Sequence, residues 1–238
     1  MWRVECWKSG TGHYESGAKV AEKDENTAMS STDHHSFVLG VDIDGVVGDY
    51  ESIFRQVVSD SLGVDPAEIP AQTHWGFDDS GWPLRDEDHY LEMHRRGIAE
   101  YEMFAAMQPV EGASDALWRL SDAGVHIRIV THRLYVNWDH QNVVAQTVGW
   151  LQQPREDGRP LIPYRDLCFM GDKTDVGADL YVDDAPHNIA ALRKSHADVI
   201  CFDRLYNRDI PGLRARNWNE VEELVMRRVE ERGITLRP

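Results

Sequence analysis

The chain has 238 residues, of which 42% are hydrophobic and 9% aromatic, so it is not disordered throughout. Its 25 Lys and Arg against 41 Asp and Glu give a net charge of −16, which argues against a general binder of the nucleic-acid backbone. No segment is apolar enough to span a membrane, and the first residues lack a secretory signal. The odd number of cysteines (Cys6, Cys168 and Cys201) favours a reducing, cytoplasmic setting without structural zinc.

Residues 1–36 are predicted to form a mobile leader, because they are rich in polar residues and show neither helical nor strand periodicity. Met29 lies shortly before the first predicted strand, and we consider it an alternative start to Met1. N-terminal sequencing of the native protein would test this hypothesis, and a product that begins at Met1 would contradict it.

From Phe37 onward, apolar strands alternate with amphipathic helices. Short apolar runs, typical of strands buried on both faces, predict strands at 37–43, 126–130, 167–170, 180–182 and 199–202. Helical spacing predicts helices from Tyr50 to a stop at Gly63, at about 86–104, at 113–123, at 143–151, around 189–192, and from a capping-box-like start at Asn217 and Glu220. This alternation predicts an α/β fold, a Rossmann-like parallel sheet with helices on both faces.

Polar residues suited to chemistry follow four of these strands directly. Because ligands of parallel sheets bind beyond the carboxyl ends of the strands, these side chains should converge on one small volume. In chain order they are Asp42 and Asp44, then Thr131, then Lys173, and finally Asp183 with Asp184.

Such a set of groups fits phosphoryl transfer. Clustered carboxylates stay ionised only beside a cation, and oxygen ligands favour a hard ion, Mg²⁺ rather than zinc. A metal, a lysine and a hydroxyl can cradle a phosphate, one carboxylate can act as nucleophile, and a second can protonate the leaving oxygen. A single Asp-x-Asp more often caps a helix or lies in a solvated loop. Four elements in this order, each directly after an apolar strand, favour the catalytic interpretation.

Three blocks of the sequence resemble the haloacid dehalogenase superfamily of phosphotransferases, and within it the 5'(3')-deoxyribonucleotidase family. Residues 42–50 match that family's DxDGVLADF opening, residues 172–184 match its DKTVVxxDLLIDD segment without a gap, and residues 109–113 resemble its PxPGA turn. The resemblance covers about residues 37–230 and is faint outside these blocks.

The resemblance implies a role for each matched position. Asp42 would be the nucleophile and a Mg²⁺ ligand, and Asp44 would be the general acid and base, offering its backbone carbonyl to the metal. Asp183 would complete the set of metal ligands, and Asp184 would lie behind these ligands or act through water. Thr131 and Lys173 would hold the phosphoryl oxygens.

The second motif departs from the family pattern, because Thr131-His132-Arg133 stands where the family has Thr-Ser-Pro. One phosphate-facing hydroxyl is thereby replaced by an imidazole, which we interpret as a packing or hydrogen-bonding group. Arg133 is a candidate for binding the phosphate or a second anionic group, and the alternative is a surface cation. The change leaves the nucleotide specificity more open than the phosphatase chemistry.

The resemblance also implies two domains beyond the leader. A catalytic core would comprise residues 37–49 and 109–238, and a small helical cap, residues 50–108, would be inserted after the first strand and close over the site. The acidic run 86–88 is interpreted as the solvated start of a cap helix. Aromatic residues of a small cap usually form its core, but four are candidates for stacking on a substrate base: Tyr50, Trp75, Phe77 and Phe104.

Together these observations favour a Mg²⁺-dependent phosphomonoesterase that acts through an aspartyl-phosphate on a small phosphorylated metabolite, first of all a nucleoside monophosphate. A phosphatase of the same fold for a sugar phosphate is the alternative. A signalling receiver domain would place its acidic pair first and its lysine last, and a non-catalytic nucleotide-binding protein would usually have lost a catalytic position. The expected partners include neither a nucleic-acid polymer nor a membrane, and the oligomeric state, a homodimer included, stays open.

Overall fold

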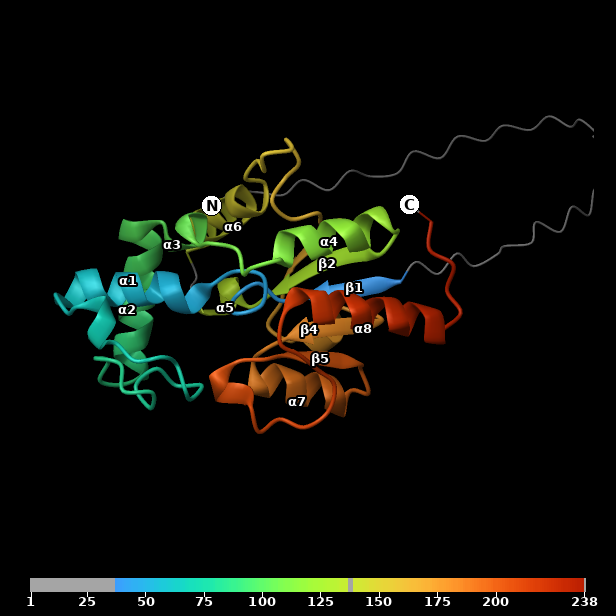
Figure 1. The fold of residues 1–238 in the computed structure, drawn as a ribbon. Coiled ribbons are helices and arrows are strands. Elements are labelled where there is room, and N and C mark those ends of the chain that lie inside the picture. Colours follow the sequence, from blue (N-terminus) through green and yellow to red (C-terminus); the bar gives the residue numbers. More distant parts are fainter. Residues whose placement is uncertain (1–36, 137–138, 238) are drawn as a thin grey trace, which may run out of the picture. The chain divides into compact units, whose positions relative to one another are not determined.

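The computed structural model describes residues 37–136 and 139–237, so the predicted leader and the Met29 start lie outside the described residues. Six strands form one parallel sheet in the order β3-β2-β1-β4-β5-β6. Figure 1 labels the central four, from β2 through β1 and β4 to β5. They are β1 (Val38–Val41), β2 (His126–Thr131), β3 (Asp166–Phe169), β4 (Leu180–Asp183), β5 (Val199–Phe202) and β6 (Arg214–Ala215). The five predicted strands and the α/β fold class are confirmed. The two-residue β6 was not predicted, because it is too short for an apolar run.

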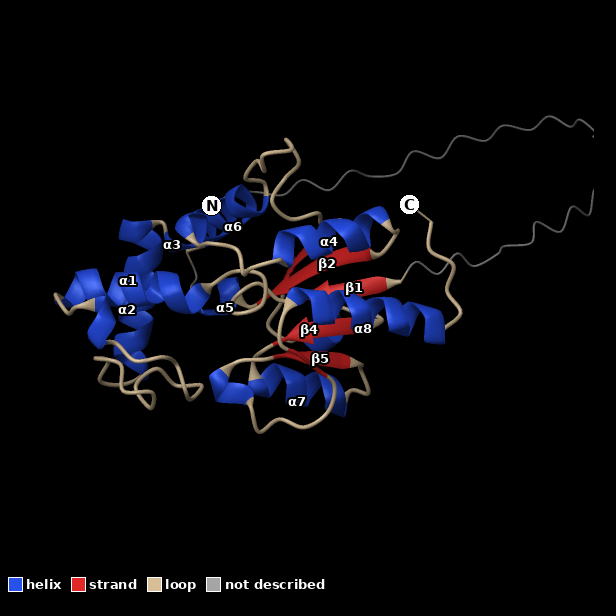
Figure 2. Cartoon of the chain, viewed as in Figure 1, coloured by secondary structure: helices blue, strands red, loops and turns tan. Residues whose placement is uncertain are grey.

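Helices alternate with these strands (Figure 2). They are α1 (Tyr50–Leu62), α2 (Glu87–Tyr101), α3 (Met103–Ala106), α4 (Ala113–Asp122), α5 (Arg133–Val136), α6 (His140–Leu151), α7 (Pro186–Lys194) and α8 (Trp218–Glu231), with 3₁₀ turns η1 (Pro66–Glu68), η2 (Lys173–Asp175) and η3 (Leu205–Asn207). Within the two described stretches of the chain, no helix is both long and apolar enough to cross a membrane.

The helix ends follow local chemistry. Gly63, at φ 68°, ends α1 as predicted, and Asp86 caps α2, whose exposed acidic first turn was also predicted. The predicted helix at 86–104 is instead divided, because Glu102 adopts a left-handed conformation at φ 47° between α2 and α3. Asn217 caps α8 by accepting a hydrogen bond of 3.0 Å from the backbone N–H of Glu220.

Helices cover both faces of the sheet. Val182 of β4 and Ile200 of β5 pack in one apolar cluster with the inner faces of α4 and α8. Their strand neighbours Tyr181 and Cys201 point the other way and pack in a second cluster with α7. This alternation follows from the two-residue period of a strand, and it explains why β4 and β5 are almost continuously apolar.

Residues 50–108 form a helical insert that holds α1, α2 and α3. Its two connections to the sheet lie side by side: the backbone N–H of Asp49 donates to the carbonyl of Gln108, and that of Val110 donates to the carbonyl of Val47, both at 2.8 Å. The insert has an apolar cluster of its own, completed by Val143 of α6. Its action as a separate cap stays a prediction.

Candidate active site

A tight loop carries Asp42 and Asp44 out of β1. Beyond the end of the strand, the backbone N–H groups of Val47 and Gly48 both donate to the carbonyl of Ile43, at 2.9 and 2.8 Å. Gly45 has φ +83°, and a Cβ at this position would collide with the carboxylate beyond β4. Glycine therefore lets this loop pass close beside the end of the neighbouring strand.

Lys173 joins the ends of β1 and β4. Its Nζ donates to Asp42 Oδ1 at 2.5 Å and to Asp183 Oδ2 at 2.7 Å. The two carboxylates are neighbours because β1 and β4 pair in parallel, with Val41 opposite Val182. The side chains of Lys173 and Asp183 are each only 2% exposed. Because an unpaired buried charge is costly, these three groups stabilise one another.

The acidic side chains of this cluster fit a divalent cation. Ligand oxygens of Asp42, Asp183 and Asp184 all lie within 4.8 Å of one another. Burial raises the pKa of Asp42, and the neighbouring carboxylates raise it further against the opposing charge of Lys173. Burial and the nearby Asp183 raise the pKa of Asp184 to about 7. A cation would relieve this repulsion, and an all-oxygen donor set suits a hard ion such as Mg²⁺.

Three residues that were not predicted from the sequence support these acids and the loop that follows β1. The Tyr206 hydroxyl donates to the Asp184 carboxylate. Asn188, in α7, donates through Nδ2 to both oxygens of Asp183, at 3.3 and 3.4 Å. Arg204 donates through Nε to a backbone carbonyl of the β1 loop at 2.7 Å. Arg204 and Tyr206 lie two and four residues beyond the end of β5, so the strand-end rule applied to that strand as well would have indicated both.

At the end of β2, Thr131 and His132 lie beside this cluster. Thr131 is buried, and its Oγ1 accepts a hydrogen bond of 3.2 Å from the backbone N–H of Arg133. The His132 ring stacks on that of His187, with centroids 6.1 Å apart, and within the described chain its buried Nε2 has no hydrogen-bond partner. Burial, together with the charge of Lys173, lowers the pKa of His132. His132 thus packs against another ring at a position that disfavours its charged form.

Arg133 is buried and contacts a carboxylate of the site. Its Nε and Nη2 donate to Asp44 Oδ2 and Oδ1, at 2.9 and 2.7 Å. Nη1 donates to Thr147 Oγ1 at 3.0 Å, and the guanidinium carbon lies 3.8 Å from the centre of the Phe104 ring. The surface-cation alternative is therefore wrong. The anionic group that Arg133 contacts in the protein itself is Asp44.

Three of the four aromatic candidates lie in or against the apolar cluster of the insert. Phe77 and Phe104 are buried there, and the guanidinium of Arg133 covers one face of Phe104. Tyr50 is partly buried against the same cluster, with its hydroxyl 3.3 Å from that of Tyr90. The stacking of these rings on a substrate base stays a prediction.

The fourth aromatic candidate, Trp75, is 49% exposed. It lies in the loop before α2 and meets two rings of the core edge-on. Its ring centroid is 5.1 Å from that of His187 and 5.5 Å from that of Tyr206. Trp75 therefore links the insert to the residues beside the acidic cluster, and its contact with a substrate stays a prediction.

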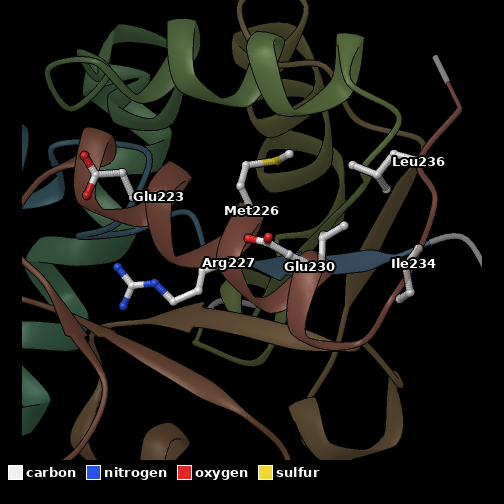
Figure 3. Close-up of a pocket in the computed structure, with 7 residues that line it drawn as sticks. Glu223, Met226, Arg227, Glu230, Ile234 and Leu236 are labelled. Carbon is white, nitrogen blue, oxygen red and sulfur yellow. The ribbon is translucent and has the colours of Figure 1, made fainter.

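A separate surface hollow lies along α8 and the C-terminal segment. Its labelled lining residues come only from these two stretches (Figure 3), and they are Glu223, Met226, Arg227, Glu230, Ile234 and Leu236. The end of α8 lies beside the start of β1, as the distance of 5.7 Å from the guanidinium carbon of Arg232 to the ring centre of Phe37 shows. This hollow contains none of the predicted site residues.

The parallel sheet with a helical insert after β1 is the fold of haloacid dehalogenase-like hydrolases. Two solved structures support the fold. One is a HAD family hydrolase from Deinococcus radiodurans with bound phosphate and sodium, at 16% identity and TM-score 0.51 over 84% of this chain and 97% of that chain. The other is a protein described as a "Putative Phosphatase" from Clostridium difficile, at 14% identity and TM-score 0.51 over 80% and 99%.

The sequence comparisons give the family. The family model described as "5' nucleotidase, deoxy (Pyrimidine), cytosolic type C protein" matches residues 36–230. A Chlorobaculum tepidum protein described as a "Putative 5'(3')-deoxyribonucleotidase" is 40% identical over 201 residues, which cover 84% of this chain and 94% of that protein. A 5'(3')-deoxyribonucleotidase of Bacillus subtilis is 24% identical over 128 residues, covering 53% and 67%. The chain therefore belongs to the deoxyribonucleotidase family and is a phosphoric monoester hydrolase, as the three sequence blocks predicted.

Proposed function

We propose that this protein is a Mg²⁺-dependent phosphomonoesterase for nucleoside monophosphates, first of all deoxyribonucleotides. The observation that carries the proposal is the bridge from Lys173 to Asp42 and Asp183, with Asp184 beside it. This arrangement would supply a nucleophile, a lysine cation and the ligands of a metal ion in one buried volume. Family membership supports a nucleotide rather than another phosphate ester as the substrate.

In the first half of the proposed reaction, a carboxylate oxygen of Asp42 attacks the phosphorus of the substrate. The bond between phosphorus and the ester oxygen breaks, and Asp44 gives a proton to that oxygen, so the nucleoside leaves. Asp42 then carries the phosphoryl group as an aspartyl-phosphate. In the second half, Asp44 takes a proton from water, which attacks the phosphorus, and the bond to Asp42 breaks to release inorganic phosphate.

The other residues of the site hold charge during these steps. Lys173 and Thr131 would bind the phosphoryl oxygens, and the charge of Lys173 offsets that of Asp42. The carboxylates of Asp42 and Asp183 and the backbone carbonyl of Asp44 would hold Mg²⁺, with Asp184 in direct or water-mediated contact. When bound, the ion neutralises charge on the transferring phosphoryl group.

The helical insert would act as the cap and supply contacts to the nucleoside. Trp75 supports this role, because it is half exposed and lies against two rings beside the acidic cluster. Tyr50 is the second candidate for contact with the base. Phe77 and Phe104 are buried, so they would act on the substrate by shaping the insert.

Phosphate release from a panel of esters tests the proposal. The panel comprises deoxyribonucleoside and ribonucleoside 5'- and 3'-monophosphates and sugar phosphates, each with Mg²⁺ and with EDTA. We expect Mg²⁺-dependent release that is strongest on deoxyribonucleotides. Release mainly from sugar phosphates would support the proposed reaction but contradict the nucleotide substrate. Release that is unaffected by EDTA would contradict the dependence on Mg²⁺.

The Asp42→Asn variant tests the nucleophile. It should lose turnover, since an amide cannot form the aspartyl-phosphate. The matched control is Asp60→Asn, which makes the same change at an exposed position of α1 and should keep full activity. Retained activity of Asp42→Asn would exclude the proposed mechanism.

A further inference from the structure

The Arg133 guanidinium fixes the side chain of Asp44 through two hydrogen bonds. Both carboxylate oxygens of Asp44 accept hydrogen bonds from it, at 2.7 and 2.9 Å, in a two-point contact that fixes the plane of the carboxylate. The Asp44 side chain is 27% exposed, whereas that of Arg133 is only 1% exposed. The Asp44 carboxylate is therefore partly exposed to solvent, whereas the Arg133 guanidinium that sets its orientation is buried.

The guanidinium is itself fixed from two sides. On the core side, Nη1 donates to the fully buried Thr147 of α6. On the insert side, the guanidinium lies over the ring of Phe104 in α3 and 3.8 Å from the sulfur of Met107. The position of Asp44 is thus tied to the position of two insert residues, through a single buried cation.

We propose that Arg133 is a positioning residue that orients Asp44 for proton delivery to the leaving oxygen, and that Phe104 of the insert holds Arg133 in the required plane. Asp44 enters this step with the proton that it took from water in the preceding turnover, held on an oxygen lone pair that the guanidinium does not use, and it leaves the step as a carboxylate. This role rests on the proposed function, in which Asp44 acts on the leaving group. It differs from the phosphate contact expected from the sequence, because the hydrogen bonds to Asp44 and Thr147 engage Nε, Nη1 and Nη2.

A comparison of two leaving groups tests the proposal. A deoxyribonucleoside 5'-monophosphate releases a strongly basic alkoxide that needs a proton, whereas p-nitrophenyl phosphate releases a weakly basic phenolate that does not. The value of kcat/KM reports the steps up to departure of the leaving group, so it includes this proton transfer and excludes the later hydrolysis of the aspartyl-phosphate. In Arg133→Lys, which keeps the charge but loses the two-point contact, kcat/KM should fall about 100-fold for the nucleotide and less than about threefold for p-nitrophenyl phosphate.

Two further variants complete the experiment. Phe104→Leu removes the ring under the guanidinium but stays apolar, and it should show the same selective loss to a smaller extent. It also keeps the test open if Arg133→Lys folds poorly in a thermal melt. Arg119→Lys is the matched control, because Arg119 likewise binds both carboxylate oxygens of a partner, Glu222, on the surface between α4 and α8. It should leave both substrates unaffected.

Each other outcome would overturn the proposal. An equal loss on both substrates, together with weaker competitive inhibition by inorganic phosphate, would assign Arg133 to phosphate binding instead. Unchanged kinetics in both Arg133→Lys and Phe104→Leu would leave Arg133 a purely structural residue. If the wild-type protein hydrolyses neither ester, the proposed function is rejected, and the role of Arg133 with it. This outcome is distinct from the others because it is seen in the wild type, before any variant is measured.

Discussion

Replacing Asp184 with asparagine should make the stability of the metal-free protein less dependent on pH. The Asp184 carboxylate is 2% exposed and lies among the carboxylates of Asp42 and Asp183. Burial and the charge of Asp183 raise its pKa from the ordinary 3.8 to about 7. The asparagine side chain of the Asp184→Asn variant would keep the shape and could still accept the hydrogen bond of the Tyr206 hydroxyl, but it would carry no charge.

The sign follows from proton binding. A carboxyl group whose pKa is higher in the folded state binds its proton more tightly there, so the folded state loses stability as the pH rises from the unfolded pKa through the folded one. This loss of folding stability is absent below about pH 4 and complete above about pH 8. With about 1.4 kcal/mol for each pKa unit, the change from 3.8 to about 7 corresponds to at most about 4 kcal/mol.

Urea unfolding, followed by tryptophan fluorescence in EDTA at about pH 4.5 and about pH 8, measures this effect. The free energy of unfolding of Asp184→Asn, relative to wild type, should be higher at about pH 8 than at about pH 4.5. Asp60→Asn, at an exposed position, should not reproduce this difference. Mg²⁺ should stabilise the wild type at about pH 8 and the variant less, because the ion takes the place of the proton. Parallel pH profiles of wild type and Asp184→Asn would refute the reasoning.

Three other substitutions have defined outcomes. Gly45→Ala, at φ +83° and facing the carboxylate of Asp184, should lower the unfolding free energy by about 1–3 kcal/mol and reduce phosphate release; an active variant of normal melting temperature would contradict this. Trp75→Ala, which loses the contact with Tyr206, should raise KM for deoxyribonucleotides more than KM for p-nitrophenyl phosphate in steady-state assays; equal changes would exclude a base contact. Phe54→Ala removes a fully buried ring of the insert and should cost about 3–5 kcal/mol in urea unfolding, and a loss below about 1 kcal/mol would contradict its place in that cluster.

The sequence predicted the fold wherever local pattern and burial agree. β1, β4 and β5 lie between two covered faces, so almost every residue in them is apolar. β2 and β3 include polar residues, but their shorter apolar runs are also visible without a structure. β6 lacks this signal, because its two residues are a strand only through their pairing with Cys201 and Phe202 at the sheet edge. The break at Glu102 is also a tertiary effect, since the sequence around it has no glycine or proline to mark a helix end.

The same distinction applies to the site. Chain order and the strand-end rule were enough to predict that Asp42, Lys173 and Asp183 would meet, since β1 and β4 are parallel neighbours. The partner of Arg133 could not be predicted in this way. Its ion pair with Asp44 joins residues 89 positions apart, and it depends on how α6 and the insert enclose the guanidinium. Residue type alone left a phosphate contact and a surface position equally open.

The pairing of the site's cations has a consequence for substrate binding. With a net charge of −16, the whole chain repels an anionic substrate, so attraction must arise locally. Yet Lys173 is paired with two carboxylates and Arg133 with a third. The charge of Lys173 is therefore already balanced by the protein's own acids before a phosphate arrives, and the guanidinium of Arg133 is directed at Asp44 and Thr147. A dianionic phosphate ester should consequently bind weakly without a divalent cation, and substrate and metal should each strengthen the binding of the other by the same factor.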